Sequence, residues 1–133
     1  MDNDFIKDLV QSIKIRLGAL GYQLKDTDDP LLEFETEKMC AFVVDEINTT
    51  TIPARIKFLM IDVIVAEYLN MKLINGQLGD NFDAEVAVKK LSEGGRSITF
   101  NVGAPIEERF ESIISKKMEQ LHERFGSHRR MEW

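Results

Sequence analysis

The segment from Ala54 to Ile74 constrains the fold more than any other, because it is apolar on nearly every side. Its apolar pattern runs unbroken for about twice the roughly ten residues that strands seldom exceed, so it predicts a helix despite its β-branched residues. Pro53 suits the first turn of that helix, and the pair Asn75-Gly76 suits its end. A helix that is apolar all round is buried on most sides. We therefore predict a central helix enclosed by its neighbours.

Three further helices are predicted from capping residues and apolar rows. They run from Asn3 or Asp4 to Gly21, from Asp29-Pro30 to Asn48, and from Gly103-Ala104-Pro105 to Gly126. The apolar face of the second of these is predicted to consist of Leu31, Phe34, Cys40, Val43, Val44 and Ile47. Cys40 is predicted to be a small core residue rather than a reactive thiol, because no cationic partner lies nearby in the sequence.

The stretch from Val86 to Phe100 is predicted to form a short β-hairpin. Both arms alternate between apolar and polar residues, and Gly94-Gly95 supplies the positive φ angles of a tight turn. A two-stranded hairpin is marginally stable alone in water, so this one needs something to pack against. The residues expected to contact a neighbouring subunit are Glu93, Gly94, Gly95, Arg96, Ile98 and Phe100. The predicted fold class is mainly α, a small bundle of four main helices with a short β-hairpin inserted before the last helix.

The length of 133 residues suits one helical domain over residues 1–126, followed by a flexible basic tail over 127–133. The tail is either a frayed end or a contact, since it carries Arg129, Arg130 and Trp133, and interfaces favour Arg and Trp. The longest apolar run is interrupted by Asp62 and is far too short to span a bilayer. The N-terminus is acidic where a signal peptide would be basic, so we expect no export and no membrane contact.

The net charge of −6 argues against a general nucleic-acid binder, because duplex affinity comes largely from Lys and Arg that neutralise phosphates. The acidic residues crowd the stretch from Asp26 to Glu37. One interpretation is a solvated helix N-terminus, where carboxylates complement the helix dipole. The other is a surface that repels DNA or docks on a basic partner.

We expect no catalytic residue, cofactor or metal, and therefore no enzyme. The sequence has no Gly-x-Ser-x-Gly motif and no phosphate loop, and its histidines fit no zinc pattern. Glu119-x-x-His122 matches half of a di-iron carboxylate motif, which needs a second half from a facing helix. Asp62 and Glu67 are predicted to lie on different faces of the central helix, since neighbours on one face come three or four residues apart.

The order of these elements resembles the small head–tail connector proteins, also called head-completion or adaptor proteins, of tailed bacteriophages and prophages. The resemblance is carried by Ile52-Pro53, Ala66-Glu67-Tyr68-Leu69 and the segment Ser92–Phe100, and it covers the chain from about Asp29 to Arg130. It implies a structural virion protein that forms a homo-oligomeric ring of about twelve copies beneath the portal at the capsid vertex. Such a ring continues the DNA channel and docks the next neck or tail-completion protein.

The resemblance further implies a location in the virion neck, after assembly in the cytoplasm of the host bacterium. DNA is expected to pass through without sequence-specific binding, since an acidic wall offers few cations to phosphates. Arg129, Arg130 and Trp133 are expected to contact the portal protein. The alternative is a small helical phage or prophage regulatory protein that binds DNA or a protein partner. Against that alternative, no predicted helix carries a cluster of Arg and Lys suited to the major groove.

Overall fold

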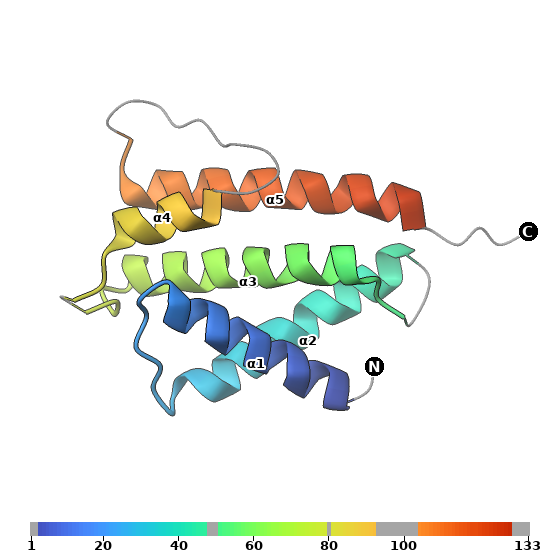
Figure 1. Cartoon of the computed structure of the whole chain (residues 1–133), viewed down its shortest axis with the longest axis horizontal. Helices are drawn as coiled ribbons and strands as arrows, with labels where there is room; N and C mark the ends of the chain where they lie inside the picture. The colour runs from blue at the N-terminus through green and yellow to red at the C-terminus, as the bar shows by residue number, and fades with distance from the viewer. Residues whose placement is uncertain (1–2, 48–50, 80, 93–103, 129–133) are drawn as a thin grey trace, which may run out of the picture.

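The computed structural model describes residues 3–47, 51–79, 81–92 and 104–128, and these residues form five helices and no strand. In chain order the helices are α1 (Asn3–Ala19), α2 (Asp28–Ile47), α3 (Ala54–Ile74), α4 (Ala84–Ser92) and α5 (Ile106–His128) (Figure 1). The prediction of a mainly helical protein is confirmed. None of the helices in these ranges is both long enough and apolar enough to cross a membrane.

Helix α3 lies at the centre of the bundle. Helix α5 runs alongside it in the opposite chain direction, whereas α1 and α2 cross its other side, with α1 in front of α2 in Figure 1. The short α4 packs against α5 near its first turns. The apolar side chains that α3 buries among these neighbours are Ile56, Met60, Ile61, Val63, Ile64, Val65, Ala66, Tyr68 and Leu69. The central helix is therefore confirmed, with the bounds that the sequence predicts.

The ends of α3 follow from local backbone chemistry. Pro53 holds an extended conformation (φ −62°, ψ 152°) immediately before the first turn. At the other end the amide of Asn75 donates to the carbonyl of Met71 over 3.1 Å. Gly76 then takes a φ of 67°, which residues with a Cβ adopt only at a cost, and this conformation commonly terminates helices. Gly21, with a φ of 96°, follows α1 in the same way.

The predicted β-hairpin is wrong, because its first arm is helical. Val86 and the residues up to Ser92 belong to α4. Asp83 starts this helix, since its carboxylate accepts hydrogen bonds from the amides of Glu85 (3.1 Å) and Val86 (3.2 Å). The buried side chains are Ala87, Val88 and Leu91, which are spaced as one helical face rather than as every second residue. The predicted contact residues from Glu93 to Phe100 lie outside the described residues.

The predicted apolar face of α2 is partly wrong. Its buried residues are Asp28, Leu32, Thr36, Cys40, Val43 and Ile47, which follow one another at steps of three or four. Leu31 and Phe34 fall outside that row, and they are 43% and 62% exposed. The prediction for Cys40 is confirmed, since its side chain is fully buried and burial raises the pKa of its thiol to about 11.

Helix α5 continues past Gly126 to His128, so the predicted end at Gly126 is wrong. A glycine inside a helix costs only about 1 kcal/mol relative to alanine. The buried Leu121 and Phe125 pack the preceding turns against the core, which offsets that cost. The residues 129–133 of the predicted tail lie outside the described ranges.

Candidate functional site

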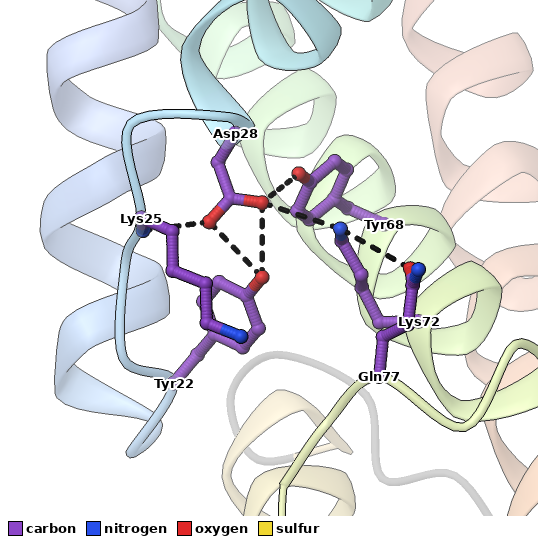
Figure 2. Close-up of polar contacts among 6 residues, drawn as sticks. All are labelled: Tyr22, Lys25, Asp28, Tyr68, Lys72 and Gln77. Carbon is purple, nitrogen blue, oxygen red and sulfur yellow. Dashed lines mark hydrogen bonds and ion pairs between the residues drawn. The ribbon is translucent and has the colours of Figure 1, made fainter.

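A buried carboxylate, Asp28, is surrounded by donors at the start of α2 (Figure 2). The hydroxyl of Tyr22 lies 3.0 Å from each carboxylate oxygen, and the backbone amide of Lys25 donates to Oδ2 over 2.9 Å. From α3, the hydroxyl of Tyr68 donates to Oδ1, and Nζ of Lys72 lies 3.4 Å from the same oxygen. We call these five residues the Asp28 cluster. It joins the α1–α2 loop to the C-terminal half of α3.

Burial and hydrogen bonding fix the charges of this cluster. Burial alone would raise the pKa of Asp28, but the donors around the carboxylate favour its charged form and hold the pKa below its usual range. Burial, and then the adjacent carboxylate, raise the pKa of Tyr22 to about 12 and also raise the pKa of Tyr68. Both phenols therefore stay protonated and donate at neutral pH.

Lys72 is held from two sides. Its ammonium group donates to Oε1 of Gln77 over 3.4 Å and lies 5.4 Å from the centre of the Tyr68 ring. A hollow of about 130 Å³ lies beside the cluster, lined by the loops around Tyr22 and Gln77, and Asp28 does not line it. Since the carboxylate is shielded and its acceptor sites are occupied, the Asp28 cluster ties the fold together and offers no open reactive group.

An apolar hollow of about 370 Å³ lies between α2, α3 and α5. A second hollow of about 220 Å³ shares three of its residues and extends it along α3 to Tyr68 and Met71. We call the first hollow the α2–α3–α5 groove. Its lining residues are Glu35, Lys38, Met39, Phe42, Ile64, Glu67 and Met118. Apolar side chains thus form its floor, and two carboxylates and one ammonium group stand among them.

The charge of the groove is predominantly acidic. Burial, and then the negative charge of Glu35, raise the pKa of Glu67, whereas Lys38 lowers it. Nζ of Lys38 lies 4.0 Å from a carboxylate oxygen of Glu35, one helical turn away on α2. One ammonium group therefore faces two carboxylates, and a further cation brought by a partner would be favourable here.

A different surface lies on the other side of α3. Asp62 pairs there with Nε of Arg16 from α1 (3.7 Å) and with Nζ of Lys117 from α5 (3.3 Å). Phe58, one turn earlier on the same row of α3, is 65% exposed. We call these four residues the Phe58 patch. The prediction that Asp62 and Glu67 lie on different faces of the central helix is confirmed.

The half motif Glu119-x-x-His122 is not part of a metal site in the described chain. Glu119 pairs with Lys116 over 3.5 Å. The His122 ring lies edge-on to Phe42 and Phe125, with ring centres 6.2 and 5.4 Å away. Among the residues that the structure describes, no group of His, Cys, Asp and Glu is placed to hold a metal ion.

Sequence reasoning missed both the Asp28 cluster and the groove. It assigned Asp28 only to a run of acidic residues. Tyr68 and Lys72 lie four residues apart on an otherwise apolar helix, and this spacing indicates two polar groups on one face but does not indicate Asp28 as their partner. The groove leaves no such signal, because its residues come from three helices.

The residues predicted to touch a subunit or the portal cannot be located in the fold, since Glu93–Phe100 and Arg129–Trp133 lie outside the described ranges. Comparisons with known proteins add no further assignment. No protein-family model matches the chain, and neither a curated protein nor a solved structure matches it.

Proposed function

We propose that the chain is a structural virion protein, a head–tail connector that assembles as a ring beneath the portal at the capsid vertex. The observation that carries the proposal is the presence of two unlike exposed surfaces on opposite sides of α3, namely the α2–α3–α5 groove and the Phe58 patch. A ring needs such a pair, because each subunit meets its two neighbours through different surfaces.

The residues that carry the resemblance to connector proteins support the same proposal. Ile52-Pro53 leads into α3, Glu67 lines the groove, and Tyr68 belongs to the Asp28 cluster. The motif therefore coincides with the helix that separates the two surfaces. The proposal no longer includes a β-hairpin. It assigns the contact between subunits to the α2–α3–α5 groove and the Phe58 patch instead.

The charge of the chain suits a DNA channel. With a net charge of −6 it offers few cations to phosphates, so a passing duplex would slide rather than bind. The downstream face would dock the next neck or tail-completion protein. Arg129, Arg130 and Trp133 in the C-terminal tail remain the proposed portal contact.

The proposal is tested by mixing the purified chain with the portal protein encoded in the same genome and imaging the mixture by cryo-electron microscopy. The expected result is an added ring of density at one end of the portal. The double substitution Arg129→Ala with Arg130→Ala should weaken this binding while leaving the helical fold intact.

A gel shift with duplex DNA at low salt provides the opposing measurement. A duplex complex that dissociates as salt rises, together with no binding to the portal, would contradict the connector proposal and favour the regulatory protein.

A further inference from the structure

Phe58 is exposed near the end of α3 that lies away from α4. Helix α4 has nine residues and packs near the first turns of α5, beside the last turns of the antiparallel α3 (Figure 1). Phe58 lies in the second turn of α3, at the opposite end. A phenylalanine that is 65% exposed contributes little to its own core, whereas aromatic side chains dominate the energetics of interfaces.

The surroundings of Phe58 are basic overall. Arg16 and Lys117 both approach Asp62, but the side chain of Lys117 is only 8% exposed, so Arg16 is the cation of this group that a partner can reach. Arg55, exposed one turn before Phe58 on the same row of α3, adds a further cation. The α2–α3–α5 groove has the reverse balance, with two carboxylates and one ammonium group around an apolar floor.

The two surfaces point in different directions. Phe58 and Glu67 are nine residues apart on α3, which at 3.6 residues per turn places them about half a turn apart around the helix axis. Phe58 lies toward the α1 side, where Asp62 meets Arg16, whereas Glu67 lies toward the α2 side. One molecule therefore cannot bring its own patch into its own groove.

We propose that Phe58 of one copy inserts into the α2–α3–α5 groove of a second copy of this chain. The apolar floor of Met39, Ile64 and Met118 would receive the ring. The accessible cations near Phe58, Arg16 and Arg55, would meet Glu35 and Glu67. This inference deepens the proposed function, on which it rests for its biological setting, by naming the surfaces that neighbouring subunits share.

The contact is heterologous, because it joins two different surfaces. In a pair, one copy still has an unused groove and the other copy still has an unused patch, so association continues until a ring closes. A two-fold dimer contact would instead consume the same surface on both copies. This difference provides the test.

The test uses two variants that each disable one surface. Phe58→Asp removes the aromatic ring and leaves the groove intact, whereas Met39→Asp places an acid in the groove floor and leaves the patch intact. Sedimentation velocity is run at concentrations up to about 1 mM, which reaches contacts with a Kd as weak as millimolar. We expect the unaltered chain to associate beyond a dimer, each variant alone to be monomeric, and their equimolar mixture to form only a one-to-one dimer.

Ile74→Asp is the matched control, because it also replaces an exposed apolar side chain of α3 (59% exposed) with an acid, outside both surfaces. It should associate like the unaltered chain. Circular dichroism and thermal melts of all variants check that loss of association does not reflect unfolding.

Three results would overturn the contact: a monomeric unaltered chain at every concentration, association of Phe58→Asp equal to that of the unaltered chain, or a mixture of two folded variants that stays monomeric. The portal experiment separates this failure from failure of the proposed function. Rings that Phe58→Asp still forms on the portal would refute the contact and keep the function. Association through Phe58 without portal binding would keep the contact and refute the function.

Discussion

The Asp28 cluster and the α2–α3–α5 groove both place carboxylates beside α3, but they shift the pKa of those carboxylates in opposite directions. In the cluster, one buried carboxylate accepts from every donor around it, and its pKa is lowered. In the groove, two carboxylates share one ammonium group among apolar side chains, and the pKa of Glu67 is raised. The first arrangement is complete within one chain, whereas the second gains from an added cation. The comparison separates polar residues that hold the fold from those that are available to a partner.

The largest effect is expected from Asp28→Ala. The substitution leaves Lys72 as a buried cation without its counter-charge, and the two phenols lose their acceptor. Removing one partner of a buried ion pair typically costs about 3–5 kcal/mol in the free energy of unfolding. Urea denaturation measures this loss. Asp29→Ala is the control, since Asp29 is an exposed residue paired with Lys14 and should cost less than about 1 kcal/mol. Equal costs for the two variants would contradict a special role of the buried carboxylate in holding the fold.

Tyr68→Phe should have a smaller effect than Asp28→Ala, because it removes one hydroxyl and leaves the other donors of the carboxylate in place. Hydrogen bonds to charged groups typically contribute about 1.5–3 kcal/mol. The same urea measurement applies. In the double variant with Asp28→Ala the cost of Tyr68→Phe should largely disappear, since the phenol no longer has its acceptor. Additive costs would show that the hydroxyl acts independently of Asp28.

Stability should depend on pH at both ends of the scale. Asp28 has a folded pKa below the unfolded value of about 3.9, so its contribution is present above that value and is lost as the pH falls through the folded pKa. Tyr22 has its pKa raised to about 12, so its contribution is complete below pH 10 and is lost as the pH rises toward about 12. The urea midpoint measured across pH follows both changes. In Asp28→Asn the urea midpoint should fall less steeply at acid pH. An unchanged fall would show that other carboxylates cause it.

The smallest effect is expected at the groove, and its sign is reversed. Because burial and Glu35 raise the pKa of Glu67, its charge opposes folding at neutral pH. Glu67→Gln should therefore leave stability unchanged or raise it, by no more than about 0.5 kcal/mol, since the side chain is shielded only in part and solvent still screens its charge. Thermal melts at pH 7 compare it with Glu37→Gln, which is exposed outside the groove. A clear loss of stability in Glu67→Gln would place Glu67 with the Asp28 cluster instead.

The central helix could be predicted from the sequence because its signals are local. Pro53 and Asn75-Gly76 mark its ends, and apolar residues predominate on nearly every side between them. The wrong prediction at Val86 also depended on local signals. Val86 and Val88 alternate over too short a window to exclude a helix, and the spacing of Val88 and Leu91 fits a helical face equally well. The glycine pair that follows gave the strand interpretation more weight than the helix-starting Asp83.

The candidate sites could not be predicted, because their contacts are distant in the sequence. Asp28 and Tyr68 are separated by 40 residues, and nothing local in either segment indicates the other. The exposed positions of Leu31 and Phe34 also depend on which face of α2 meets α3, a choice that the apolar residues around α2 leave open. The groove requires α2, α3 and α5 to be placed together before it exists.

The single cysteine can report on transient local opening of this protein. Cys40 is fully shielded in the middle of α2, so a thiol reagent reaches it only when that helix lifts away from the core. Its labelling rate therefore counts how often the opening occurs. Because the Asp28 cluster anchors the first turn of the same helix, loosening that anchor should speed the labelling. A partner bound in the α2–α3–α5 groove should slow the labelling. The labelling rate of one thiol therefore reports on both regions.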